Sequence, residues 1–467
     1  MTANGAMKNY RSYSFWLDTC GDDLTPRPPL DGPAEVDVAI VGAGFTGLWT
    51  AYHLLQREPS LNVLVVEKEI AGFGASGRNG GWCCADFPAG IPYLIEHYGR
   101  DAARAVSLAM MESVDNVGAV CAKEGIDAHY DKGGELDIAR AEYDLPKLEE
   151  TWREYDSIGL GDHMLLLDKE QTAERIRVAG MVGSSWTRDA AVIQPARLAR
   201  GLAHAVERHG GRIVEQTTVL DYFGGTAPRL ITDRGVVRAR RAIVLAGEAY
   251  LSRLPKLRRH VIPMTSHMVV TEPLGPEIWE QIGWQHRDVT VGNGSDGGYL
   301  NHTADGRIAF GAYRAKYPFL SRITDAIDRR EDVFAHARNA ARTWFPALRD
   351  VTFTHAWGGV FGVPRDHMPT MGFNRQTKVA LAFGYTGEGV ATSNLSGRVL
   401  TDLITETDSD LAHLPMTRHQ PRLWEPEPLR AIGVNLIRHA RRQQAIIAEE
   451  TGAYPEQMPL YARLLDR

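Results

Sequence analysis

Apolar residues near the start of the chain form a buried strand, a glycine turn and a helix in direct succession. The run 37–41 is almost entirely apolar, and glycines follow at positions 42, 44 and 47. Apolar residues then continue at helical spacing to Tyr52, and a second apolar run at 63–66 ends at Glu67. Two short buried strands that flank a helix are typical of a parallel α/β sheet. We therefore predict a βαβ unit here.

The glycine spacing in this unit predicts a dinucleotide site. Gly42 allows a tight turn, Gly44 lets the backbone approach a pyrophosphate, and Gly47 lets helix and strand pack closely. The helix N-terminus presents free N–H groups to the phosphates. Glu67 at the end of the second strand has the position to accept hydrogen bonds from an adenosine ribose. A glycine turn without a ligand is the alternative interpretation.

The remaining pattern predicts an α/β fold: a Rossmann-like domain with an interleaved domain built on a mixed or antiparallel sheet. Alternating runs at 268–271 and 307–311 indicate antiparallel strands, whereas 379–390 again reads as a strand and glycine turn. Aromatic residues in a Pro-rich first segment suggest an arm that docks on the protein. We predict an arm at 1–34, the nucleotide domain at 35–85, 190–255 and 352–410, the substrate domain at 86–189 and 256–351, and a helical extension at 411–467.

Composition narrows the function classes. The chain has 467 residues, 44% of them hydrophobic and 24% charged, and a net charge of −6. We therefore expect no nucleic-acid partner and no attraction to an anionic membrane. The N-terminal residues lack a signal-peptide pattern and no long apolar run is present, so a cytoplasmic location is the default. The four cysteines lack paired spacing, which predicts reduced thiols and no metal site.

Three glycine-rich segments in a fixed order make the prediction more specific. They are the unit at 37–67, the loop Gly72-Phe-Gly-Ala-Ser-Gly-Arg-Asn-Gly-Gly81, and the turn Gly384-Tyr-Thr-Gly-Glu-Gly389. Together they resemble the FAD-dependent amine and amino-acid oxidoreductases, the family of D-amino acid oxidase, glycine oxidase and sarcosine oxidase. The resemblance covers about residues 35 to 405. Within the family, the Ala-Ser-Gly-Arg-Asn-Gly-Gly loop looks most like that of gamma-glutamylputrescine oxidase.

The resemblance implies a set of FAD-binding residues. Val219 would hold the adenine through its backbone, and the start of the helix near Val390 would stabilise electron density on the flavin. Ser76, Arg78 and Asn79 have side chains suited to a phosphate or the polar edge of the flavin. The full set is Gly42, Gly44, Phe45, Thr46, Gly47, Glu67, Lys68, Gly74, Ala75, Ser76, Gly77, Arg78, Asn79, Gly80, Gly81, Val219, Ala246, Gly247, Gly358, Gly387, Glu388, Gly389 and Val390.

Two departures from the family concern the cofactor. The glycine loop has no His, and Gly359 stands where monomeric sarcosine oxidase has its flavin-linking Cys, so we expect FAD to be non-covalent. The segment 305–311 lacks the Lys with which sarcosine oxidases speed their reaction with oxygen, and Arg307 is its only cation. The electron acceptor, oxygen or another, therefore stays open, and we expect slow use of oxygen.

A third departure concerns the substrate. Phe361 occupies the position at which the glycine-oxidase pattern has the Arg that clamps the substrate carboxylate. A ring cannot replace a bidentate guanidinium, which favours amines over free α-amino acids. Arg365 is either an alternative cation or a solvated loop charge.

The predicted reaction is FAD-dependent oxidation of a C–N bond in a primary or secondary amine. Hydride transfer to flavin N5 would give an imine, which hydrolyses, and gamma-glutamylputrescine-like substrates lead the list. The alternatives are an amino-acid oxidase or dehydrogenase, and an FAD-binding tailoring protein without fast turnover. No acid or base is assigned, and the candidate substrate-side residues are His267, Trp357, Phe361 and Tyr299, with His302 and Tyr313 as further possibilities.

The C-terminal segment 424–442 reads as a basic, partly amphipathic helix. Its apolar stripe is formed by Leu429, Ile432, Leu436 and Ala440. Such a stripe is usually buried. We expect it to pack on the protein or in a homo-oligomer, with membrane attachment as the less favoured alternative.

Overall fold

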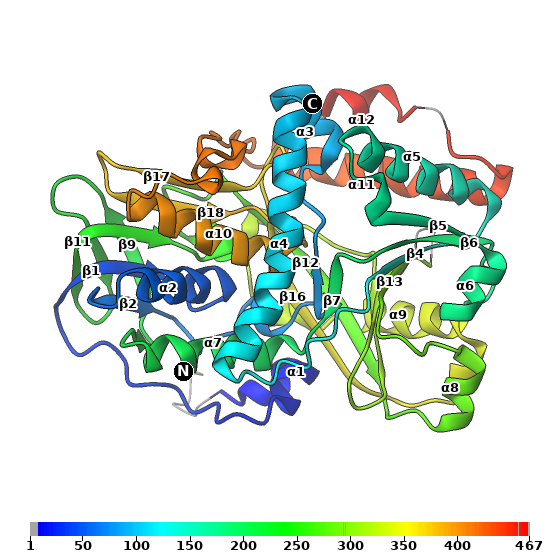
Figure 1. The fold of residues 1–467 in the computed structure, drawn as a ribbon, viewed down its shortest axis with the longest axis horizontal. Coiled ribbons are helices and arrows are strands. Elements are labelled where there is room, and N and C mark those ends of the chain that lie inside the picture. Colours follow the sequence, from blue (N-terminus) through cyan, green and yellow to red (C-terminus); the bar gives the residue numbers. More distant parts are fainter. Residues whose placement is uncertain (1–7, 293, 295, 456, 466–467) are drawn as a thin grey trace.

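Two large β-sheets lie side by side in the computed structural model, with a long helix, α4 (Arg100–Glu124), between them (Figure 1). The structure describes residues 8–292, 294, 296–455 and 457–465. The arm and the C-terminal extension predicted above therefore lie partly outside the described residues. The architecture is mixed α/β, as predicted.

The first sheet carries the nucleotide-binding pattern. Its strand order is β17-β18-β11-β1-β2-β8, and the β9–β10 hairpin extends from β11. Strands β1, β2, β8, β11 and β18 are parallel, and the apolar runs 38–40, 63–66 and 242–245 in β1, β2 and β11 are buried on both faces, which explains why they are continuous. The strand bounds are β1 Ala34–Val41, β2 Val63–Val66, β8 Arg212–Val214, β9 Val219–Phe223, β10 Arg229–Thr232, β11 Val236–Leu245, β17 Thr370–Asn374 and β18 Val379–Phe383.

Helices α2 (Phe45–Arg57), α7 (Pro195–Arg208) and α10 (Gly389–Ile404) pack together beside this sheet. Helix α10 crosses α2 so closely that a Cβ atom at Gly397 would lie 2.7 Å from the Cβ atom of Trp49. Trp49 and its neighbours are fully buried in the main apolar core. Because residue 397 is a glycine, α10 can lie this close to α2, and the start of α10 lies near the glycine turn before α2.

The second sheet is mixed, with strand order β16-β12-β15-β14-β13-β4-β6-β5. Among the described residues, the β13–β4 pair is its one parallel pair. Its strand bounds are β4 Glu135–Ala139, β5 Met164–Asp168, β6 Gly183–Thr187, β12 Ile262–Thr271, β13 Val289–Gly292, β14 Gly298–His302, β15 Ile308–Ala312 and β16 Phe353–Val363. A short separate pair joins β3 (Trp82–Cys84) to β7 (Ala190–Val192).

The structure differs from the predicted division at β16. We placed 352–410 in the nucleotide domain, but β16 pairs antiparallel with β12 along nearly its whole length, from Ile262 opposite Val363 to Thr271 opposite Phe353. Backbone hydrogen bonds thus place β16 at the edge of the second sheet. Gly359 of β16 therefore lines the cavity from the second sheet.

The remaining helices cover the edges and faces of the two sheets. Helix α4 is long and apolar enough to cross a membrane by length and composition, but many of its apolar side chains, among them Val106, Met110, Val114 and Val117, are fully buried in the main core. The other bounds are α1 Phe15–Thr19, α3 Gly90–Tyr98, α5 Leu145–Ser157, α6 Lys169–Arg175, α8 Pro276–Ile282, α9 Glu331–Trp344, α11 Leu429–Thr451 and α12 Leu460–Leu465.

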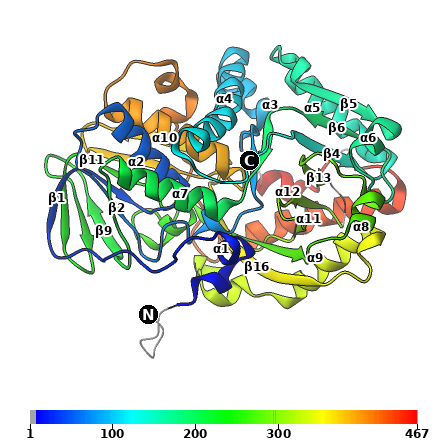
Figure 2. The same cartoon turned by 60° about the horizontal axis from the view of Figure 1, so that its bottom comes forward.

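The N-terminal arm runs from α1, at the junction of the two halves, along the first sheet to β1 (Figure 2). Its aromatic residues Tyr10, Phe15 and Trp16 are buried, and the indole N–H of Trp16 donates to the carbonyl oxygen of Asn79 at 2.7 Å. The hydroxyl of Ser14 donates to the carbonyl oxygen of Gly77 at 2.8 Å. The docked arm therefore holds the glycine loop in place through these two hydrogen bonds.

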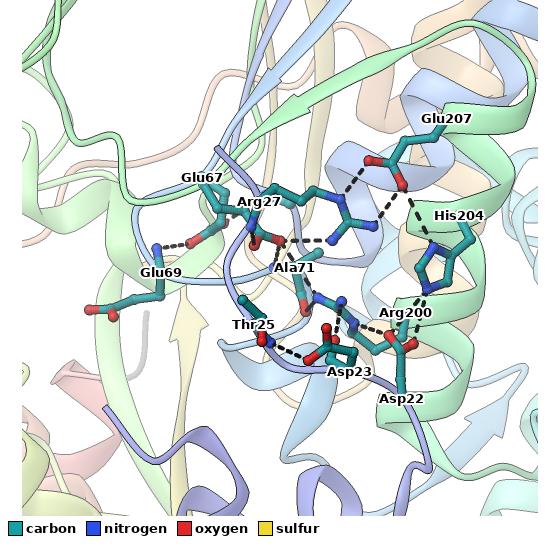
Figure 3. A network of polar contacts seen from close by, with 12 residues as sticks. Asp22, Asp23, Thr25, Arg27, Glu67, Glu69, Ala71, Arg200, His204 and Glu207 are labelled. Atoms are coloured by element: carbon teal, nitrogen blue, oxygen red, sulfur yellow. Dashed lines mark hydrogen bonds and ion pairs between the residues drawn. The ribbon is translucent and has the colours of Figure 1, made fainter. Parts of the chain in front are cut away.

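Charged groups hold the middle of the arm (Figure 3). The guanidinium of Arg27 pairs with Glu207 on α7 and with the fully buried Glu215, at 2.6 and 2.9 Å. Glu215 also accepts the N–H of Ala71 at 2.7 Å, immediately before the glycine loop. Arg200 on α7 pairs with Asp22 of the arm at 2.5 Å. This network joins the arm, α7 and the glycine loop.

The C-terminal stripe is only partly covered. Ala440 on α11 is fully buried, whereas Leu429, Ile432 and Leu436 are 60%, 52% and 39% exposed. Packing on the described chain therefore accounts for one end of the stripe. A homo-oligomer through α11 stays a prediction.

Candidate active site

A cavity of about 690 Å³ lies between the two sheets. Its lining comes from the glycine turn of α2, the loop after β2, the segment after β11, the start of α10, and strands of the second sheet. A volume of this size is typical of cavities that hold a cofactor or small ligand. The cavity therefore joins the three glycine-rich segments that the sequence singled out.

The glycine turn forms one end of the cavity. Gly42 has a φ of +98°, and its N–H donates to the carbonyl oxygen of Val66 at 2.9 Å. A Cβ atom at Gly47 would lie 2.0 Å from the carbonyl oxygen of Gly42, so only glycine fits that helix position. A Cβ atom at Gly44 would lie 3.0 Å from the hydroxyl oxygen of Ser76 and would project into the cavity lining. The turn thus presents bare backbone to a ligand, as a pyrophosphate requires.

Glu67 lies in this end of the cavity. Its carboxylate accepts the N–H groups of Ala43 and Glu69, both at 2.8 Å. Burial raises the pKa of Glu67 to about 7, although the two backbone donors act in the opposite direction. Val219 and Lys68 line the same region. The predicted ribose acceptor is therefore held in place by backbone hydrogen bonds, with further lone pairs available to a sugar hydroxyl.

Arg78 in the glycine loop connects the two halves of the molecule. Its side chain is 1% exposed and pairs with Asp328 of the second half at 2.7 Å. It also donates to the hydroxyl of Tyr250 at 2.9 Å, and its guanidinium lies over the ring of Phe73, 4.7 Å from the centroid. Desolvation raises the pKa of Asp328, while the guanidinium opposes that rise. Arg78 is thus a fixed, paired cation in the cavity wall.

The neighbouring loop side chains are used to hold the loop itself. The hydroxyl of Ser76 accepts the N–H of Phe45 at 2.8 Å, which fixes the loop against the start of α2. Asn79 donates to the carbonyl oxygen of Ala75 at 3.1 Å and accepts the N–H of Gly81 at 2.8 Å. Both side chains line the cavity from these fixed positions.

The other end of the cavity is walled by strands of the second sheet and by the turn before α10. Phe361, Tyr299, Tyr313, Ser266 and Glu388 line it. Tyr299 is held in a slot made by glycines, since a Cβ atom at Gly311 would lie 2.0 Å from its ring and one at Gly80 would lie 3.1 Å from it. The Tyr299 hydroxyl hydrogen-bonds to Ser266, and burial raises the pKa of this tyrosine to about 12. This end combines aromatic surface with the carboxyl group of Glu388.

Most of the residues predicted to bind the cofactor line the cavity. The exceptions are Gly47, Gly77, Gly81 and Gly358, which do not line it. Added Cβ atoms at these four positions would lie within 3 Å of neighbouring backbone or side-chain atoms, so their role in the structure is close packing behind the lining.

Two of the four substrate-side candidates lie away from the cavity lining. His267 is buried, its Nε2 atom lies 2.8 Å from the carbonyl oxygen of Ile327, and burial lowers its pKa. The indole N–H of Trp357 donates to the carbonyl oxygen of Arg78 at 2.9 Å, which supports the loop from behind. Alternation along β12 explains the position of His267, because its neighbour Ser266 faces the cavity. Trp357 is on the same face of β16 as Phe361 but lies four residues farther along the strand, under the glycine loop.

The other cations and rings that we considered are also engaged elsewhere. Arg307 pairs with Asp305 at 2.7 Å and donates to the carbonyl oxygen of Thr271. Arg365 pairs with Glu425 at 3.2 Å. His302 stacks on Trp279, and burial lowers its pKa to about 4.

Sequence reasoning missed many of the lining residues, among them four with polar side chains, Lys8, Glu248, Tyr250 and Asp328. Glu248 and Tyr250 directly follow the predicted Ala246–Gly247 segment, so extending that segment would have included them. Glu248 accepts the N–H groups of Gly384 and Tyr385 at 2.9 and 3.2 Å and so fixes the late glycine turn. Asp328 and Lys8 carry no local signal, because tertiary packing alone brings them to the cavity.

Comparison with known proteins agrees with this geometry. A family model described as FAD dependent oxidoreductase (DAO) matches residues 37–403. Gamma-glutamylputrescine oxidoreductase of Escherichia coli (strain K12) is 30% identical over 414 residues, which cover 86% of this chain and 92% of that protein. The glycine oxidase of Bacillus licheniformis is 21% identical over 377 residues, covering 79% of this chain and 92% of that protein.

The fold of solved structures is similar as well. The crystal structure of glycine oxidase from Geobacillus kaustophilus superposes with a TM-score of 0.68 at 22% identity, covering 83% of this chain and all (100%) of that chain. The family match spans the glycine turn, the loop and the start of α10 that together line the cavity. The chain therefore belongs to the DAO family of FAD-dependent oxidoreductases and is an enzyme that oxidises C–N bonds of amines or amino acids.

Proposed function

We propose that the substrate is a primary or secondary amine, with gamma-glutamylputrescine-like amines as the leading candidates. The observation that carries this proposal is the substrate-side wall: Phe361, Tyr299 and Tyr313 present rings, and Glu388 presents a carboxyl group. A cationic amine is attracted by ring faces and by a carboxylate, whereas a carboxylate substrate needs a paired cation. The name of the 30% identical relative supports the same substrate class.

The basic side chains of the cavity are placed elsewhere. Within the described lining they are Lys8, Lys68, Arg78 and Arg253, and none of them belongs to the strands or the turn that provide the substrate-side wall. Lys8 pairs with Glu69 at 2.9 Å and Arg78 with Asp328. The positive charges therefore suit the cofactor and its phosphates better than a substrate carboxylate.

The residues of this chain would position the two reactants. When bound, FAD supplies the acceptor for the hydride that leaves the α-carbon of the amine. The bare backbone of Gly42 and Gly44 would hold the pyrophosphate, and Glu67 would hold the ribose. The rings of Phe361 and Tyr299 would exclude water and orient the amine.

The direct test is anaerobic bleaching of the flavin's visible absorption by a panel of substrates. We expect amines, gamma-glutamylputrescine among them, to bleach the holoenzyme, and glycine or D-alanine to do so far more slowly. Preferential bleaching by α-amino acids would favour the amino-acid alternative. No bleaching by any compound would favour an FAD-binding protein without fast turnover.

We expect FAD to be bound without a covalent link. The glycine loop offers no His, and residue 359 is a glycine with no side chain to attach a flavin. Acid precipitation of the holoenzyme should leave the yellow colour in the supernatant. Flavin that stays with the precipitated protein would contradict this prediction and would require another attachment residue.

We also expect oxygen to be a poor electron acceptor. The segment 305–311 contains no Lys, and its Arg307 is tied to Asp305 on the second sheet, outside the cavity lining. After anaerobic reduction by substrate, reoxidation in air-saturated buffer should be much slower than reoxidation by a quinone or artificial dye. Reoxidation by oxygen at the rate of the dye would show that another cation of the cavity performs this role.

A further inference from the structure

Glu388 has a position that the predicted reaction leaves unexplained. It is the residue directly before α10 and lines the cavity at the end where Tyr299 and Tyr313 form the wall. The predicted cofactor set includes it only as part of a glycine turn. Its carboxyl group, however, is suited to a substrate ammonium rather than to an electron-rich phosphate or flavin carbonyl.

Among the described residues, Glu388 interacts with acids, phenols and a thiol. The thiol of Cys84 donates to its carboxyl oxygen at 3.1 Å. The other groups that interact with it electrostatically are Asp86, Glu135, Tyr299 and Tyr313. None of these is basic. Burial, followed by the charge of Asp86, raises the pKa of Glu388 to about 7, and the thiol hydrogen bond opposes the rise.

Cys84, the hydrogen-bond partner of Glu388, also lies close to two further acids. The polar atoms of Cys84, Asp86 and Glu135 all lie within 4.8 Å of one another. Desolvation by the surrounding protein raises the pKa values of both acids, yet the side chain of Asp86 still reaches solvent.

An alkylammonium must lose a proton before its α-carbon releases a hydride, because the nitrogen lone pair stabilises the cation that forms. Free alkylamines have pKa values of about 10, like the Lys side chain, so the substrate enters as the ammonium at neutral pH. A carboxyl group with a raised pKa is a better acceptor for that proton than an ordinary Glu. The site therefore needs a base, and the cavity lining offers one at its substrate end.

We propose that Glu388 accepts the proton of the substrate ammonium. In this step the N–H bond of R–NH₃⁺ breaks, its electron pair stays on nitrogen, and the proton forms an O–H bond on the Glu388 carboxylate. The products are a neutral amine and a neutral carboxylic acid. The inference rests on the proposed amine substrate and assigns a catalytic role to this chain's own residue.

The test compares Glu388→Gln with the wild-type holoenzyme. In the wild type, anaerobic flavin reduction at subsaturating amine should rise with pH to a plateau above about 7, because the deprotonated form of Glu388 is the active one. In Glu388→Gln the rate at neutral pH should fall about 10²- to 10⁴-fold, and the rise should move toward the pKa of the amine itself. Glu388→Asp should restore part of the rate at neutral pH.

A second measurement does not depend on turnover. Infrared titration of the holoenzyme should show a carboxylic-acid band that disappears with a midpoint near pH 7, and this component should be missing in Glu388→Gln. Cys84→Ala removes a donor that stabilises the carboxylate, so the midpoint should rise. Asp350→Asn, at an exposed acid outside the cavity lining, is the matched control and should keep both the band and the rate.

The outcomes separate the two proposals. If Glu388→Gln binds FAD and keeps the wild-type pH profile, or if its infrared titration is unchanged, the assignment of Glu388 is wrong while the amine substrate stands. If no amine bleaches the wild-type flavin, the proposed function fails. The infrared titration then still shows whether Glu388 is the group that titrates near neutral pH.

Discussion

Replacing Gly44 with valine should leave the purified protein without FAD. The new Cβ atom would lie 3.0 Å from the Ser76 hydroxyl, and the branched methyl groups would fill space in the cavity lining that a pyrophosphate needs. Ser76 has little freedom to move away, since it holds the N–H of Phe45 at the start of α2. We expect the ratio of flavin to protein absorbance to fall by at least about tenfold after purification.

The matched control is Gly275→Val. Gly275 precedes α8, has an ordinary negative φ of −71°, and a Cβ atom added there meets no atom within 4 Å. This variant should retain its FAD. Circular dichroism and thermal unfolding of both variants would show that loss of cofactor, rather than loss of fold, explains the colourless Gly44→Val protein. A fully loaded Gly44→Val protein would refute the assignment of this turn to the pyrophosphate.

Local patterns explain why the cofactor end of the site was predictable from sequence. The strand, turn and helix at 37–52 follow one another directly in the sequence. A Cβ atom at Gly47 would overlap the carbonyl oxygen of Gly42, five positions earlier in the chain. Such constraints involve residues close in sequence and therefore appear in the sequence as fixed spacings.

Long-range pairing explains what sequence analysis could not predict. Arg78 was predicted to contact the cofactor, but its partner Asp328 lies 250 positions away, and only the packing of the two halves brings them to 2.7 Å. The same holds for β16, whose glycines resemble those of the nucleotide domain although its backbone pairs with β12 of the second sheet. Pattern and composition carry no information on which distant strand supplies the hydrogen bonds.

The substrate end of the cavity was only partly predictable from the sequence. Alternation along a strand predicts that neighbouring residues face opposite sides, but it does not say which side is the cavity. Tyr299 and Phe361 line the cavity, whereas His267 is buried on the other face of its strand and Trp357 is buried farther along β16. The acids around Glu388 come from the segment after β3, from β4 and from the turn before α10, so no single stretch of sequence reveals them.

The largest change in substrate preference should come from Phe361→Arg. Phe361 lies on β16 opposite Met264 of β12 and lines the cavity, so an arginine there would place a guanidinium in the substrate-side wall. In the wild type, a substrate carboxylate at this position would be desolvated without a partner, which costs several kcal/mol and disfavours α-amino acids by orders of magnitude. A bidentate guanidinium removes that cost.

We therefore expect the ratio of amine to α-amino-acid turnover to fall by about 10²-fold or more in Phe361→Arg, measured as the rate of anaerobic flavin reduction per unit concentration of substrate. Phe361→Leu keeps an apolar wall and should keep the amine preference, while Phe319→Arg adds the same charge at a side chain that is 57% exposed and outside the main cavity lining. If Phe319→Arg shifted the preference equally, the effect would be one of net charge. Efficient oxidation of glycine or D-alanine by the unmodified protein would show that a residue other than 361 reads the carboxylate, and the enzyme would then be an amino-acid oxidoreductase.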